Sequence, residues 1–92
     1  MTGAPASRTS LPFGPFRLGI AEVERVAGLR ALAALVAVFA GSDDPAVAAL
    51  RHAEVDVSAS DQALAEFDKL PALPRRHVLA SYARLMRPRR AS

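Results

Sequence analysis

The sequence predicts a small all-α domain of four helices with a central apolar helix, a flexible N-terminal arm and a short basic C-terminal tail. Apolar side chains recur at helical spacing in four segments, and Gly or Pro residues stand between those segments. No alternation of apolar and polar residues is long enough for a useful strand. We expect the arm over residues 1–17, the helical domain over residues 18–88 and the tail over residues 89–92.

The N-terminal arm is dense in helix-breaking residues. They are Gly3, Pro5, Pro12, Gly14 and Pro15. Phe13 and Phe16 bracket the turn at Gly14-Pro15, and two interpretations of these rings stay open. Either this short hook packs back onto the helices, or it docks onto a partner, since apolar residues in a disordered arm need a reason to be there.

The first helix is predicted over residues 19–40, with Gly41 as its stop. In its first turns Glu22, Glu24 and Arg25 are expected to face water. From Ala31 the sequence reads ALAALVAVFA, which is apolar all the way round. A helix of that kind must be buried on every face, so we expect it to be the central element.

The second helix is predicted to start at Pro45, after the acidic caps Asp43 and Asp44, and to fade near Ala53. Residues 55–57 are expected to form a short extended connector. The third helix is then predicted to begin at Ser58 or Ser60, where Ser58-x-x-Asp61 resembles a capping arrangement. Two prolines within residues 70–74 end it.

The fourth helix is predicted to have Pro74 in its first turn and to end before Pro88. One apolar stripe runs along it, with Arg76, Arg84 and Arg87 on the opposite side. The stripe consists of Val78, Leu79, Tyr82, Leu85 and Met86.

Composition indicates one domain with a thin core. The chain has 92 residues, of which 51% are hydrophobic, but 20 of the hydrophobic residues are Ala, which bury little area. Such a core favours oligomerisation or a partner subunit. The absence of Cys excludes disulfides and thiolate chemistry, and the preference for Arg over Lys, together with the many Ala, is typical of a GC-rich bacterial genome.

Charge is segregated along the chain. The net charge is +2 over residues 1–42, −6 over residues 43–68 and +7 over residues 69–92. In one interpretation the second and third helices lie beside the fourth, and their charges partly neutralise it. In the other, the basic C-terminus meets phosphate or an acidic partner surface. Both stay open.

No motif predicts a reaction. His52, Glu54 and Asp56 lie close in sequence, but a solvated helix end explains them better than a metal or acid–base site. There is no glycine-rich phosphate loop and no nucleophile elbow. We therefore expect no enzyme activity, cofactor or metal. The apolar run over residues 26–40 is short for a membrane span and carries a charge, so we expect no membrane association and a cytoplasmic location.

The sequence thus predicts a non-enzymatic structural or adaptor subunit that binds a protein partner or self-associates. The alternative is a nucleic-acid-binding protein that uses the Arg-rich C-terminal helix and tail. The candidate partner-binding residues are Phe13, Phe16, Arg76, Arg84, Arg87, Arg89 and Arg90.

Overall fold

The computed structural model of the chain describes residues 13–86. Within this range the chain forms four α-helices and two short 3-10 turns and contains no strand. The order is η2 (Gly14–Phe16), α1 (Glu22–Ala40), α2 (Pro45–Val55), η3 (Val57–Ala59), α3 (Ser60–Asp68) and α4 (Ala72–Leu85). The predicted all-α fold of four helices is confirmed.

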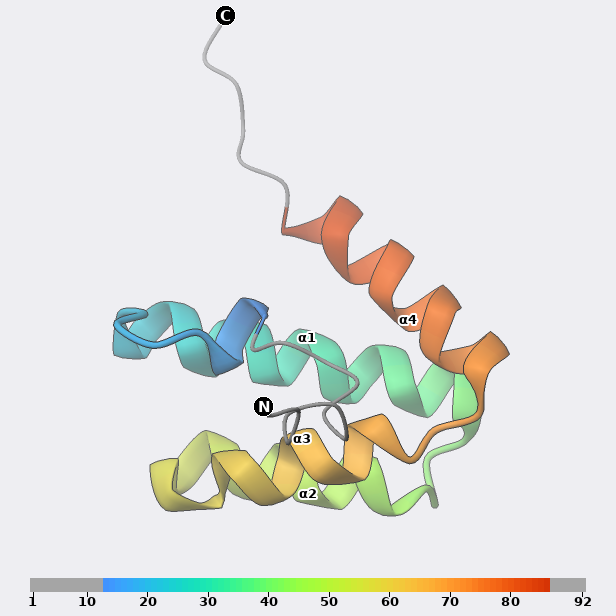
Figure 1. The fold of residues 1–92 in the computed structure, drawn as a ribbon, viewed down its shortest axis with the longest axis horizontal. Helices are drawn as coiled ribbons and strands as arrows, with labels where there is room; N and C mark the ends of the chain where they lie inside the picture. Colours follow the sequence, from blue (N-terminus) through green and yellow to red (C-terminus); the bar gives the residue numbers. More distant parts are fainter. Residues whose placement is uncertain (1–12, 87–92) are drawn as a thin grey trace, which may run out of the picture.

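Helix α1 is the central element, as predicted. It packs against α2, α4 and η2, and α3 packs against α2. In Figure 1, α1 crosses the middle of the molecule, α2 and α3 lie on one side of it, and α4 rises on the other. The fully buried core side chains come from all four helices. The largest of them are Leu29, Leu32, Val36, Leu50, Phe67 and Val78.

Two predictions about α1 are wrong. The helix begins at Glu22 and not at Gly19. It is also not buried on every face, because Val38 is 73% exposed and the neighbouring Ala34 is exposed too. Three packing partners cover only part of a helix's circumference, so one apolar face of α1 stays in contact with solvent.

Helix α2 begins at Pro45 as predicted, and the side chain of Asp44 accepts a hydrogen bond from the backbone N–H of Ala46 at 2.9 Å. The predicted extended connector is wrong. Helix α2 continues to Val55, and a 3-10 turn follows at once. Asp56 forms this turn by accepting hydrogen bonds from the backbone N–H and the hydroxyl of Ser58.

The predicted capping pair at the start of α3 is also wrong. Helix α3 begins at Ser60 after Ala59, which has no side chain able to cap it. Ser58 lies inside the preceding 3-10 turn, one residue before the cap position, and its hydroxyl donates a hydrogen bond to Asp56 at 2.6 Å. Helix α4 has Pro74 in its first turn, as predicted, but only Val78 and Tyr82 of the predicted apolar stripe are buried.

Candidate partner-binding surfaces

The phenylalanines of the predicted hook lie on the helical domain. The ring centroid of Phe13 is 5.5 Å from that of Phe16, 5.7 Å from that of Phe67 on α3 and 6.1 Å from that of Tyr82 on α4. Within the described range the hook therefore packs back onto the helices, which is one of the two interpretations of the sequence. Residues 1–12 of the predicted arm lie outside the described range.

Two glycines give the hook its close approach to α1 and α4. Gly14 has φ +46°, and a Cβ atom there would overlap the ring of Tyr82. A Cβ atom on Gly28 of α1 would lie 2.7 Å from the Tyr82 hydroxyl oxygen and 3.1 Å from Pro15. Gly28 therefore provides a notch in α1 that accepts both the hook and the end of the tyrosine ring. The sequence showed Gly28 only as an isolated glycine in a helix.

Burial raises the pKa of Tyr82. The folded chain therefore favours the protonated phenol, and this contribution to stability is present below the ordinary pKa of 10.0 and is lost as the pH rises through the higher value. The ring is 8% exposed, so it serves the core and is not an accessible proton donor.

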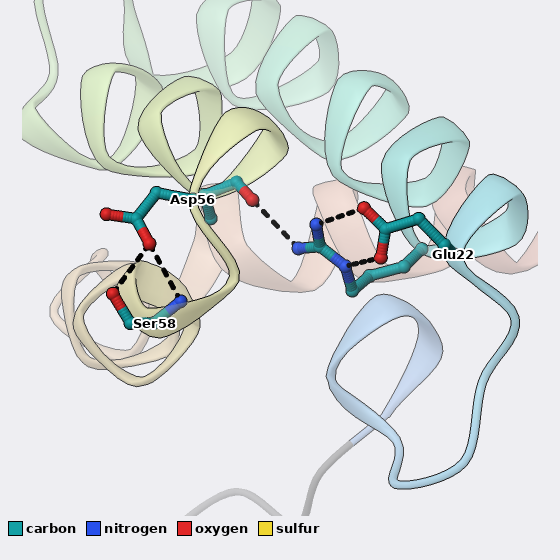
Figure 2. Close-up of polar contacts among 5 residues, drawn as sticks. Glu22, Asp56 and Ser58 are labelled. Carbon is teal, nitrogen blue, oxygen red and sulfur yellow. Dashed lines mark hydrogen bonds and ion pairs between the residues drawn. The ribbon is translucent and has the colours of Figure 1, made fainter.

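Arg25 was expected to face water, but the structure buries it to 6% exposure. Its guanidinium donates two hydrogen bonds to the carboxylate of Glu22, at 2.9 and 2.8 Å. It donates a third, at 2.8 Å, to the backbone carbonyl of Ala53 in the last turn of α2. Figure 2 shows Glu22 at this contact and the turn of Asp56 and Ser58 that follows α2. Arg25 therefore joins the first turn of α1 to the last turn of α2, where backbone carbonyls have no partner inside the helix.

The same contacts shift the pKa of Glu22. The hydrogen bonds from Arg25 lower it, so the pair contributes stability above the ordinary carboxyl pKa of 4.5 and loses it as the pH falls through the lowered value. The sequence contained one signal for the burial of Arg25, its helical spacing from core residues, which the prediction did not use. Arg25 lies four, seven and eleven residues before Leu29, Leu32 and Val36, which are buried core residues on the same face of α1.

The exposed side of α1 carries apolar residues before and after Arg30, which is exposed on the same face and pairs with Glu54 at 3.4 Å. Val23 is 81% exposed and Val38 is 73% exposed, and the exposed Ala27 and Ala34 lie between them at intervals of four and seven residues. These four residues, which we call the α1 outer face, share one side of the helix. Phe39 borders the surface near α4, where its ring centroid is 5.4 Å from that of His77.

The arginines of α4 differ in what they contact. Arg75 donates hydrogen bonds to the backbone carbonyls of Asp68 and Leu70, at 2.9 and 3.0 Å. It thereby places a positive charge at the C-terminal end of α3, where the helix dipole favours one. Arg76 and Arg84 are exposed, and no acidic side chain within residues 13–86 lies at ion-pair distance from either.

The described ion pairs leave the charge segregation in place. They join Arg25 to Glu22, Arg30 to Glu54, His52 to Asp56 and Lys69 to Glu66, so none of them links an arginine of α4 to an acid of α2 or α3. In this part of the chain, neutralisation of α4 by α2 and α3 therefore does not take the form of ion pairs. Arg87, Arg89 and Arg90 lie outside the described residues.

Apolar side chains accompany these arginines on α4. Leu73, Leu79 and Leu85 are exposed, as is Met86 at the C-terminal cap. A shallow hollow along the first half of the helix is lined by Ala72, Arg75, Arg76, Leu79 and Ala80. The outside of α4 is therefore both basic and apolar.

Within residues 13–86, no three His, Asp or Glu side chains gather where they could hold a metal ion. His52 and Asp56 face each other at 3.6 Å as an exposed pair, and the pKa of Asp56 is lowered chiefly by its hydrogen bonds to Ser58. In the same part of the chain, no helix combines the length and the apolar character needed to cross a membrane. Comparison with protein-family models, curated proteins and solved structures finds no match for this chain.

Proposed function

We propose that this chain is a non-enzymatic adaptor or accessory subunit that binds another protein, or a second copy of itself, through the α1 outer face. The observation that supports the proposal is the exposure of one side of a helix that has no charged residue from Ala31 to Ala40. Single exposed apolar residues are normal on a protein surface. Here four of them lie along one side of one helix, with Arg30 between the second and the third, and apolar residues along one side of a helix are the arrangement that helix–helix interfaces use.

The chain's core also favours a binding partner. Apart from its larger side chains, the buried cluster contains five alanines: Ala33, Ala46, Ala53, Ala59 and Ala63. Alanine contributes little buried area at about 25 cal/mol per Å². Covering Val23, Ala27, Ala34 and Val38 with another helix would add apolar burial that the chain alone does not achieve.

The proposal is tested by one substitution and a matched control. Ala34→Glu places a charge in the middle of the α1 outer face, and Ala48→Glu makes the same change at an exposed position of α2. Both positions are exposed, so both variants should keep the wild-type helix content by circular dichroism. We expect Ala34→Glu, but not Ala48→Glu, to remove self-association in sedimentation velocity or to remove specific proteins recovered with the tagged chain from its host. If neither readout separates the two variants, the α1 outer face is not an interface.

A second candidate function is nucleic-acid binding through α4 and the C-terminal tail. It is favoured by Arg76 and Arg84, which have no acidic partner among residues 13–86. Phosphate contacts make affinity fall steeply with salt, whereas an apolar interface is nearly indifferent to it. Binding of a mixed-sequence duplex and a single strand at two salt concentrations, by the full chain and by a chain truncated after Met86, tests this candidate. Binding that resists salt or survives truncation would argue against it.

A further inference from the structure

The exposed side of α4 has the spacing of a helix-docking seam. Ala72, Arg76, Leu79, Ala83 and Met86 follow one another at intervals of four, three, four and three residues, and all five are exposed. Alternating intervals of four and three keep side chains on one face of a helix, and this is the pattern with which one helix meets another in coiled coils. We call these five residues the α4 seam.

The shape of the seam suits a second helix. Its first half coincides with the shallow hollow lined by Ala72, Arg75, Arg76, Leu79 and Ala80. Alanine side chains at two of the five seam positions would let another helix backbone come close. Leu79 and Met86 supply the larger apolar surfaces that an apolar side chain of the incoming helix could cover.

The charges around the seam specify the chemistry of that helix. Helix α4 carries Arg75, Arg76, His77 and Arg84 and no acidic residue. Arg75 is already bonded to carbonyls at the end of α3, whereas no acidic side chain among residues 13–86 lies at ion-pair distance from Arg76, which is part of the seam. A guanidinium within an apolar strip is best matched by a carboxylate placed in the apolar strip of a partner.

We propose that the α4 seam docks an acidic amphipathic helix of a different protein. The apolar side of this helix covers Leu79, Ala83 and Met86, and one of its carboxylates pairs with Arg76. The inference deepens the proposed adaptor function by naming the kind of partner, and it uses a surface separate from the α1 outer face.

A second copy of this chain is a poor occupant of the seam. Pairing α4 with another α4 would bring arginines together with no acid to separate them. The acidic helix α3 presents Asp61, Gln62 and Ala65 to solvent and has no large apolar residue among its exposed positions. Helix α3 therefore has no acidic apolar face to offer a second copy.

A nucleic acid is disfavoured by the apolar half of the seam. Leu79, Ala83 and Met86 follow Arg76 along the seam, and the only aromatic ring on α4 other than His77 is the buried Tyr82. Nucleic-acid platforms that bind single strands use exposed aromatic rings for stacking, and duplex contacts to phosphate do not need an apolar strip. A protein helix can bury Leu79 and Met86 under its own apolar side chains, whereas a phosphate backbone has no apolar surface to cover them.

The experiment uses three synthetic helical peptides with one shared leucine seam. The positions facing and flanking the seam carry Glu in the first peptide, Gln in the second and Lys in the third. Binding of each labelled peptide to the full chain is followed by fluorescence anisotropy. We expect the Glu peptide to bind about tenfold more tightly than the Gln peptide, and the Lys peptide to bind most weakly.

Two variants locate the site. Arg76→Glu should weaken binding of the Glu peptide about tenfold and strengthen binding of the Lys peptide, because reversing both charges restores the pair. Leu79→Ser, which adds no charge, should weaken all three peptides. Ala48→Glu on α2 is the control and should change none of them, and circular dichroism should show equal helix content in all the variants.

Equal affinity for the Glu and Gln peptides, or the absence of a charge-reversal rescue, would overturn the inference. The inference would also be overturned if a mixed-sequence duplex displaced the Glu peptide and if Leu79→Ser left the binding of that duplex unchanged. The occupant of the seam would then be a nucleic acid. If the peptides fail to show this charge preference while the association that depends on the α1 outer face still responds to Ala34→Glu, the acidic partner of the α4 seam is ruled out. That result would leave the proposed adaptor function in place.

Discussion

At the scale of single residues, the polar contact that matters most to this fold is made by an arginine inside the core. Arg25 reaches a carboxylate in its own helix and a carbonyl 28 residues further along the chain. A buried guanidinium is tolerated only when its donors are satisfied, and the contacts to Glu22 and Ala53 satisfy three of them. The contact therefore sets how the first turn of α1 lies against the end of α2.

Replacement of Arg25 is the first prediction. Arg25→Ala removes a charge-assisted hydrogen bond to Ala53 and leaves that carbonyl without a partner, so we expect the free energy of unfolding to fall by about 2 kcal/mol. Chemical denaturation measures the loss. Glu22→Gln is the control, because Glu22 is largely solvent-exposed and its loss should cost much less. Equal losses in the two variants would show that the carbonyl contact contributes nothing.

Gly28 and Tyr82 provide the second prediction. Gly28→Ala gains about 1 kcal/mol of helix propensity. It also places a methyl group 2.7 Å from the Tyr82 hydroxyl oxygen, and overpacking of this kind costs about 1 to 3 kcal/mol. We expect a net loss of stability that Tyr82→Phe partly restores, because the oxygen in the way is then gone. A double-mutant cycle by thermal denaturation measures the coupling. Additive effects would contradict it.

At the scale of elements, the ends of helices were predictable where local sequence signals mark them. The connector after α2 and the exposure of one face of α1 were not predictable. Pro45 marked the start of α2, and Gly41 marked the end of α1, because both effects depend on the backbone nearby. The connector after α2 was mispredicted because Asp56 makes a side-chain turn with Ser58, which a valine-rich alternation conceals. The exposure of Val38 was mispredicted because burial depends on how many neighbours reach a helix and not on its own composition.

The cap of α2 gives the third prediction. The sequence offered both Asp43 and Asp44, and the structure selects Asp44, whose carboxylate accepts the hydrogen bond from Ala46. Asp44→Ala should lower the free energy of unfolding by about 1 kcal/mol. Asp43→Ala, one residue earlier and exposed, should lower it by less. Urea denaturation of the two variants separates them. A larger loss for Asp43→Ala would assign the cap to Asp43, and equal losses would contradict the assignment to Asp44.

At the scale of the whole molecule, α4 is the helix that is held least firmly. It buries Val78 and Tyr82 but leaves Leu79, Leu85 and Met86 exposed, whereas α1 buries side chains along most of its length. In Figure 1, α4 rises away from α2 and α3, which lie on the other side of α1. Sequence periodicity predicted a continuous apolar stripe on α4. It could not show that part of this stripe would lie beyond the surface of the other helices and stay exposed.

Hydrogen exchange tests this difference and gives the fourth prediction. Amides of α4 should exchange faster than those at Leu29, Leu32 and Val36 of α1, because fewer buried contacts resist local opening. Phe13→Ala should speed exchange in α4 further by removing the ring that packs on Tyr82. Leu18→Ala, at a fully exposed position, is the control. Equal acceleration in all helices after Phe13→Ala would show that the domain opens only as one unit.

The surfaces that carry the proposals were predictable to different degrees. Arg76 and Arg84 were found from the sequence because a run of basic residues without acids is visible there. The α1 outer face was not found, because the same apolar residues predicted burial. The run from Ala31 to Ala40 has no polar residue and therefore predicts burial, and only the structure shows which side of α1 the chain leaves uncovered.

The position of Phe13 also fixes an order of events during synthesis. Its ring packs on Phe67 and Tyr82, which lie 54 and 69 residues later in the chain. Because the ribosome makes the chain from the N-terminus, this hook emerges before α3 and α4, and its binding site is complete only when α4 has left the exit tunnel. Docking of the hook therefore has to wait for α4, and it closes the folding of the domain.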